Sequence, residues 1–161
     1  TGQYPFATVL HCIDSRVSAE HVFDQGIGDL FSIRIAGNFV NEDILGSMEF
    51  GCKVAGSKII VVLGHTKCGA VKGACANVEL GNLTGLIHKI KSAVDQEDTV
   101  NENRNSSNSI FVEKVAELNV AVSVKNILLH SPIIAEMVKN GEIGIVGGIH
   151  DISTGEVTFF E

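Results

Sequence analysis

Three side chains that can do chemistry occupy alternate positions in one short segment near the beginning of the chain. The segment HCIDSRV, residues 11–17, carries a thiol at Cys12, a carboxylate at Asp14 and a guanidinium at Arg16. The residues before it, FATVLH at 6–11, are apolar and rich in strand-forming types, which predicts a buried strand. Ligands of an open α/β sheet bind beyond the carboxyl ends of its strands, so these groups lie where a site is expected.

A second segment has the same organisation, because HTKC at 65–68 follows the β-branched run KIIVVL at 58–63. If the two strands are neighbours, Cys12 can converge with His65 and Cys68. We expect a helical stretch to open near His65, in which residues three apart share a face. Two thiolates and an imidazole suit zinc, and three protein ligands leave the fourth tetrahedral position open, as in catalytic sites. The residues alone also allow buried cysteines and a hydrogen-bonded histidine that only pack.

Asp14 and Arg16 have a defined place in a zinc site. Zinc lowers the pKa of bound water toward neutrality and so supplies hydroxide. A carboxylate at Asp14 can accept a hydrogen bond from that hydroxide, and Arg16 can pair with Asp14 and keep it ionised. The alternative is an ion pair that only ties the loop down, and both roles can hold together.

Length and composition restrict the class of protein. The chain has 161 residues, of which 45% are hydrophobic, so we expect a single folded domain over 1–161. The net charge of −7 argues against nucleic acid as a partner. No apolar run reaches the roughly 18–20 residues of a membrane span. The four cysteines include no C-x-x-C pair, which predicts reduced thiols and a cytoplasmic protein.

The pattern of elements predicts an α/β fold: a mostly parallel β-sheet flanked by helices, with a C-terminal antiparallel edge strand. Helix starts are indicated by Ser18, by the NED segment at 41–43 and by Ser131-Pro132. Predicted strands are 6–11, 30–35, 58–63, 143–151 and 155–161. Predicted helices are 18–24, 43–55 (ended by Gly56), 83–94, 110–130 and a last one from Pro132 to Gly141.

These motifs resemble those of the β-class carbonic anhydrases, and the resemblance extends over nearly the whole chain. It implies zinc held by Cys12, His65 and Cys68, with Asp14 and Arg16 as the catalytic dyad. The matching segments are CIDSRV (12–17), RIAGNFVNEDILGSMEF (34–50), GHTKCGAVKGA (64–74), LLHSPII (128–134) and GIHDISTGEVTFF (148–160).

The resemblance also implies a substrate pocket. Gln3 stands where plant-type members keep a glutamine that hydrogen-bonds substrate, and Phe31, Ala36 and Phe50 stand where those members line an apolar CO2 pocket. Phe50 replaces a common Tyr, and Ala36 replaces a common Val. The glutamine favours the directly active subtype, in which the zinc is open to water, over the subtype in which the aspartate caps the metal.

Quaternary structure follows from the same resemblance. Members of the family usually carry N-terminal helices that pack across a partner subunit, and this sequence lacks them. We expect a homodimer or a higher homo-oligomer. Either the native N-terminus is missing from this sequence, or the dimer is built differently.

The resulting expectation is reversible hydration of CO2 to bicarbonate and a proton by zinc-bound hydroxide. One alternative is hydrolysis of a CO2 analogue, carbonyl sulfide or carbon disulfide. Another is a non-catalytic, zinc-binding regulatory domain. Four other histidines and the two other cysteines are expected to pack or face solvent: His11, His21, His88, His130, Cys52 and Cys75.

Overall fold

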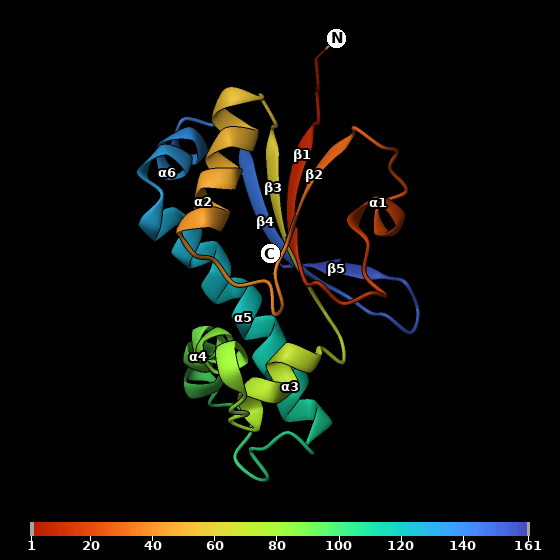
Figure 1. Ribbon diagram of the computed structural model, residues 1–161, viewed down its shortest axis with the longest axis vertical. Coiled ribbons are helices and arrows are strands. Elements are labelled where there is room, and N and C mark those ends of the chain that lie inside the picture. Colours follow the sequence, from red (N-terminus) through yellow and green to blue (C-terminus); the bar gives the residue numbers. More distant parts are fainter. Residues whose placement is uncertain (1, 161) are drawn as a thin grey trace.

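The computed structural model describes residues 2–160, which contain a five-stranded sheet. The strands are β1 (Ala7–His11), β2 (Leu30–Arg34), β3 (Ile59–His65), β4 (Gly144–His150) and β5 (Val157–Phe159). Their order is β2-β1-β3-β4-β5; the first four are parallel and β5 is antiparallel to β4 (Figure 1). The predicted fold class is confirmed. Glu161, the end of the last predicted strand, lies outside the described residues.

Helices connect the strands and cover both faces of the sheet. In residues 2–160 the helical segments are α1 (Ala19–Val22), α2 (Glu42–Glu49), the π-helical turn η1 (Phe50–Val54), α3 (Gly69–Cys75), α4 (Gly81–Gln96), α5 (Ser109–His130) and α6 (Pro132–Lys139). Figure 1 shows α2 and α6 on one side of the sheet and α1 on the other. Helices α3 and α4 lie beyond the carboxyl ends of β1 and β3, where they cover the end of the sheet.

The central strand β3 is buried on both faces, as its continuous β-branched run predicts. Ile60 and Val62 point into the cluster beneath α2, α5 and α6, whereas Val61 and Leu63 point into the cluster beneath α1. Each of these side chains contributes roughly 1.5–3 kcal/mol by burial. Both faces therefore fix the register that brings the end of β3 beside the end of β1.

Two of the three predicted helix starts have the expected cap. The side chain of Asn41 accepts a hydrogen bond from Ile44 N at 2.9 Å, and Ser131 Oγ accepts one from Ile134 N at 3.2 Å. Ser18 precedes α1 but does not cap it, because its hydroxyl donates to Glu20 Oε2 at 3.0 Å. Ser18 thus occupies the predicted N-cap position, but its side chain makes no capping hydrogen bond.

The single helix predicted over 43–55 is divided into α2 and η1. The division coincides with a close approach of the chain to β1. A Cβ on Gly51 would lie 2.7 Å from Thr8 Oγ1, so glycine allows the wider π-helical turn to pack against the sheet. Gly56 then ends the segment with a φ of +87°, as the sequence predicts.

Helix α5 joins two of the three clusters of buried residues that form the core. Its first half packs Phe111 and Val115 in the cluster that contains Cys12 and Cys68, and its second half packs Ile127 beneath the sheet. Among the described residues, no single helix is long and apolar enough to cross a membrane. The pair α5 and α6, bent by 98° at their junction, passes that test only on length and composition.

Candidate metal centre

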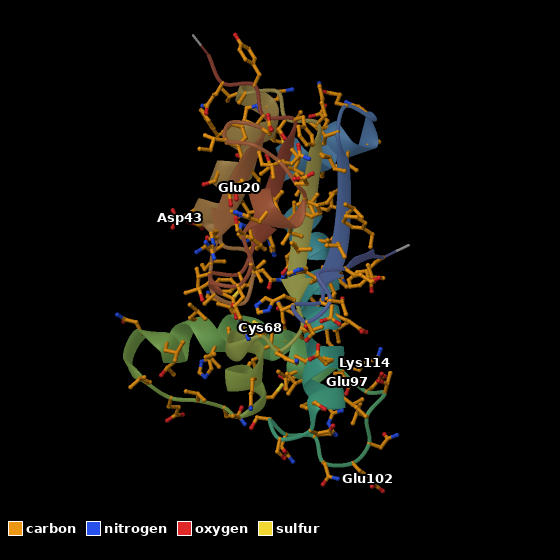
Figure 2. All side chains as sticks on the ribbon, turned by 90° about the vertical axis from the view of Figure 1, so that its right-hand side faces the viewer. Glu20, Asp43, Cys68, Glu97, Glu102 and Lys114 are labelled. Atoms are coloured by element: carbon orange, nitrogen blue, oxygen red, sulfur yellow. The ribbon has the colours of Figure 1, made fainter. Side chains whose placement is uncertain are left out.

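The carboxyl ends of β1 and β3 bring three metal-ligating side chains together. Because these strands are parallel neighbours, Cys12, which follows β1, lies at the same edge of the sheet as His65, the last residue of β3. Cys68 lies where the sheet meets α3 and α4 (Figure 2). The ligand atoms of the three buried residues all lie within 4.8 Å of one another. The structure therefore brings the three predicted ligands together.

The local structure around His65 differs from the predicted helical turn. Strand β3 continues through His65, which pairs with His150, and Thr66 N donates to the carbonyl of His150 at 3.0 Å. Lys67 then turns the chain with a φ of +56°, and Cys68 occupies the N-cap position of α3. The pairing of β3 with β4 continues past the apolar run at 58–63 as far as His65. His65 and Cys68 therefore approach each other across the end of a strand and a tight turn.

The donor atoms of this cluster fit a zinc ion. The sulfur atoms of Cys12 and Cys68 are 4.0 Å apart. Nδ1 of His65 donates to the carbonyl of Thr66 at 2.9 Å, which leaves Nε2 as the free lone pair. Within residues 2–160 this buried Nε2 atom finds no hydrogen-bond partner. An orphaned imidazole nitrogen beside two thiols is the donor set of a three-ligand zinc site.

Hydrogen bonds at Cys12 favour its thiolate form, the form that binds metal. The hydrogen bond with Cys68 lowers the pKa of the Cys12 thiol, and the backbone N–H of Gly37 also lowers it. This N–H donates to Cys12 Sγ at 3.3 Å. The same pairing with Cys12, together with burial, raises the pKa of the Cys68 thiol.

Asp14 and Arg16 form an ion pair beside the cluster. Arg16 Nη2 lies 2.8 Å from Asp14 Oδ2, and Arg16 Nε donates to Asp14 Oδ1 at 2.9 Å. The Arg16 side chain holds the pKa of the Asp14 carboxyl well below its usual range. Asp14 Oδ2 is also 3.9 Å from Nε2 of His65. An ionised, oriented carboxylate therefore borders the ligand atoms.

Arg34, the last residue of β2, is a further part of this site that the sequence reasoning missed. Its guanidinium donates to the carbonyls of Cys12 at 3.2 Å, Asp14 at 2.9 Å and Val17 at 3.1 Å. These bonds tie the whole loop after β1 to the end of β2. No local pattern could reveal them, because the acceptors are backbone atoms 17–22 positions earlier in the chain.

Comparison with known proteins identifies the family. The sequence model of the carbonic anhydrase family matches residues 7–157. The chain is a carbonic anhydrase by family. It is 35% identical over 155 residues to carbonic anhydrase 2 of Mycobacterium tuberculosis, covering 96% of this chain and 73% of that protein. It is 30% identical over 167 residues to a carbonic anhydrase of Pseudomonas aeruginosa, covering 98% of this chain and 74% of that protein.

Solved structures of β-carbonic anhydrases place this carbonic anhydrase in the β class. The Coccomyxa enzyme in complex with acetazolamide is 27% identical, with a TM-score of 0.86 over 97% of this chain and 72% of that one. The Aspergillus fumigatus enzyme CafA is 26% identical, with a TM-score of 0.87 over 99% of this chain and 77% of that one. One of two tetrameric Sordaria macrospora enzymes is 25% identical, with a TM-score of 0.83 over 99% of this chain and 82% of that one.

Two of the four residues predicted to bind substrate, Phe31 and Phe50, line a depression of their own in this carbonic anhydrase. The rings of Phe31 and Phe50 meet edge to face, with centroids 6.1 Å apart, in a depression of about 790 Å³ between β2 and α2. None of the three ligands lines this depression. Gln3 is exposed before β1, and Ala36 is half-buried next to Gly37.

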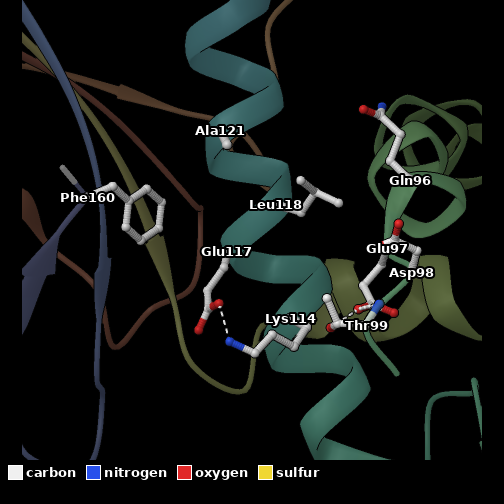
Figure 3. Close-up of a pocket in the computed structure, with 9 residues that line it drawn as sticks. All are labelled: Gln96, Glu97, Asp98, Thr99, Lys114, Glu117, Leu118, Ala121 and Phe160. Atoms are coloured by element: carbon white, nitrogen blue, oxygen red, sulfur yellow. Dashed lines mark hydrogen bonds and ion pairs between the residues drawn. The ribbon is translucent and has the colours of Figure 1, made fainter. Parts of the chain in front are cut away.

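A separate groove of about 600 Å³ lies on the outer side of α5 in this carbonic anhydrase (Figure 3). Leu118 and Phe160 face it, and Lys114 pairs with Glu117 at 2.8 Å at its rim. It contains none of the predicted metal, catalytic or substrate residues. The metal centre is therefore defined by its donor atoms and not by the size of a cavity.

The remaining histidines and cysteines lie outside the cluster. His21, His88 and His130 are exposed, and Cys52 and Cys75 are buried. His11 is buried and pairs with Ser32 Oγ at 2.7 Å. Burial, followed by the charge of Arg34, lowers the pKa of His11 to about 4. It therefore packs in the neutral form, in agreement with the packing role expected from the sequence.

Proposed function

We propose that this carbonic anhydrase uses Asp14 and Arg16 as a catalytic dyad in the reversible hydration of CO2. Two observations about Asp14 carry the proposal. Arg16 bonds both of its carboxylate oxygens, and its Oδ2 lies 3.9 Å from Nε2 of His65. Cys12, His65 and Cys68 would hold a zinc ion, which would lower the pKa of a water molecule bound to it to about 7. The Asp14 carboxylate accepts a hydrogen bond from the attacking oxygen and so directs its lone pair toward CO2.

The same pairing supports the directly active subtype. Arg16 bonds both oxygens of Asp14, which keeps the carboxylate turned to the guanidinium and ionised. An aspartate that capped the metal would have to give up at least one of these bonds. A zinc ion bound by the cluster would then remain open to water, in line with the subtype that the resemblance favours.

We place the substrate pocket between two copies of the chain. Phe31 and Phe50 lie apart from the ligands of their own chain, in a depression against the edge strand β2. Ile13, between Cys12 and Asp14, is 59% exposed, so an apolar surface borders the metal centre itself. Apolar residues exposed at both places support a homo-oligomer in which one copy's aromatic residues cover the other copy's centre.

In this arrangement Phe31, Ala36 and Phe50 exclude water around CO2, which is an apolar molecule. The amide of Gln3 donates a hydrogen bond to the carboxylate oxygen that develops as bicarbonate forms. The oligomeric state named for the Sordaria relatives agrees with such an assembly.

Stopped-flow hydration of CO2, on protein with measured zinc stoichiometry, tests the proposed function. We expect a rate proportional to zinc content and a much slower reaction with carbonyl sulfide measured beside it. Zinc-loaded protein that fails to hydrate CO2 would indicate a binding domain. Faster turnover of carbonyl sulfide than of CO2 would indicate a hydrolase of that analogue.

A further inference from the structure

A turn that follows β2 donates a hydrogen bond to one of the zinc ligands. The backbone N–H of Gly37 points at Cys12 Sγ, with the nitrogen 3.3 Å from the sulfur. Gly37 has a φ of +80° and Asn38 a φ of +40°, so two consecutive residues occupy the left-handed region. Asparagine tolerates this region better than most residues but still not freely. A backbone hydrogen bond from Asn38 N to the carbonyl of Ile35 at 3.0 Å closes the turn, and contacts from outside the turn stabilise the conformation of Asn38 further.

Helix α5 supplies the holding contacts. Asn119 Nδ2 donates to the carbonyl of Gly37 at 2.8 Å, and Ser123 Oγ donates to the carbonyl of Asn38 at 3.1 Å. Asn119 and Ser123 are each only 2% exposed and lie four residues apart, on one face of the helix. Polar side chains are costly in a core unless they are hydrogen-bonded. Among the described residues, the side chains of Asn119 and Ser123 form hydrogen bonds only to this turn.

Packing fixes the turn from the opposite side. A Cβ placed on Gly37 would overlap Cδ1 of Ile90 in α4 and lie 3.3 Å from Cβ of Ala70 in α3. The turn is thus enclosed between α3, α4 and α5, with its N–H directed at the sulfur. The carbonyls of Gly37 and Asn38, which belong to the two peptide units that follow the unit with the Gly37 N–H, are both held by α5.

We propose that Asn119 and Ser123 are positioning residues for the zinc ligand Cys12, acting through the Gly37–Asn38 turn. By holding both carbonyls, they keep the Gly37 N–H aimed at Cys12 Sγ. An N–H donor withdraws charge from a thiolate and fixes its direction, and partners of metal ligands tune both affinity and reactivity. This inference rests on the zinc site of the proposed function but not on the dyad.

Asn119→Leu tests the proposal, because leucine has a similar size and cannot donate. Zinc affinity is measured by competition with a chromogenic chelator, and the sulfur-to-metal charge-transfer band is measured after cobalt(II) substitution. We expect zinc to bind about tenfold or more weakly. We expect the cobalt band to move to lower energy, because a thiolate that has lost its hydrogen bond holds more charge.

Ile127→Val is the matched control for stability. Ile127 is buried in the same helix but packs in the cluster beneath the sheet, away from the turn. This variant lowers the unfolding temperature by a loss of packing alone, so its zinc affinity and cobalt spectrum should equal those of the wild type.

A second, milder pair keeps the test decisive if Asn119→Leu does not fold. Ser123→Ala removes the hydroxyl and should weaken zinc binding, whereas Ser123→Thr keeps it and should restore the wild-type value. Variants that unfold more easily but retain wild-type affinity and the wild-type cobalt band would overturn the proposal. A wild-type protein that binds no zinc would instead refute the proposed function.

Discussion

Asp14 and Arg16 contact each other through two parallel hydrogen bonds, Nε to Oδ1 at 2.9 Å and Nη2 to Oδ2 at 2.8 Å. Such two-point pairing fixes the plane of a carboxylate as well as its charge. Arg16 is mostly exposed, with 54% of its side chain accessible, so the pair contributes little to stability. The main effect of this ion pair is to orient the Asp14 oxygen that lies beside His65.

Asp14→Asn separates the metal site from the dyad. Asparagine keeps the size of the side chain but loses the charge that attracts Arg16 and accepts a hydrogen bond from the nucleophile. We expect zinc stoichiometry to be unchanged and kcat/KM for CO2 hydration to fall about 100-fold. Metal analysis and stopped-flow assays on the same preparation measure both quantities. Full activity in this variant would remove Asp14 from the mechanism.

Cys68→Ser tests the ligand set. A hydroxyl is a much poorer zinc donor than a thiolate, so this variant should purify with little zinc and no activity. Cys75→Ser is the matched control, because Cys75 is also buried in the cluster around α3 but is not a member of the metal-ligating group. It should retain one zinc per chain. Equal zinc content in the two variants would show that Cys68 is not a ligand.

Glu97 predicts a pH dependence of stability that is independent of the metal centre. Its Oε1 accepts from Thr99 N at 2.8 Å and its Oε2 accepts from Arg104 at 2.8 Å. Burial raises the pKa of Glu97, but the hydrogen bonds from Thr99 and Val100 outweigh it, and the pKa is lowered. A lowered carboxyl pKa adds stability above the ordinary value, about 4.3, and this is lost as the pH falls toward the folded-state pKa.

Glu97→Gln should therefore cost about 1–3 kcal/mol of unfolding free energy at pH 7, because Arg104 and the loop N–H groups lose a charged acceptor. The difference from wild type should shrink as the pH falls below about 4.3. Urea unfolding at pH 7, 5 and 3.5 measures it. Asp98→Asn, at an exposed neighbouring carboxylate, is the control and should change little. A difference that grows toward acid would contradict this sign.

The sequence predicted those parts of the site that depend on short, local patterns of residues. The apolar run at 58–63 predicts a strand buried on both faces, and the polar residues after it predict a site at its carboxyl end. The side chains of Cys12, His65 and Cys68 then meet because β1 and β3 are parallel neighbours. Donor chemistry and the expected strands made a metal centre one of two possibilities, and the resemblance to the β-class carbonic anhydrases then indicated the three ligands.

The parts that the sequence did not predict depend on contacts between distant segments. Arg34 binds carbonyls of the loop after β1, and Asn119 binds a carbonyl 82 positions earlier. An arginine or asparagine side chain that binds a distant backbone carbonyl produces no characteristic spacing of residue types in the sequence. The turn at Lys67 was missed for a related reason, because pairing of β3 with β4 decides where the strand ends.

Phe50 tests whether two copies share the substrate pocket. Its ring is 48% exposed and meets the ring of Phe31 beside the edge strand β2, away from the metal ligands of its own chain. An arginine at this position would place an unpaired charge in the proposed interface, which is costly when a partner excludes water. Leu80, an apolar residue that is 68% exposed between α3 and α4, provides a matched position outside it.

We expect Phe50→Arg to shift the protein toward monomers in sedimentation experiments and to lower kcat/KM about tenfold or more, because the pocket over the metal centre is lost. Leu80→Arg should change neither quantity, since it adds the same charge to a surface without a role in the pocket. Zinc content should stay the same in both variants, because the ligands come from one chain. A monomeric Phe50→Arg protein with wild-type turnover would show that each chain completes its own site. A fully active oligomer would remove Phe50 from both the interface and the pocket.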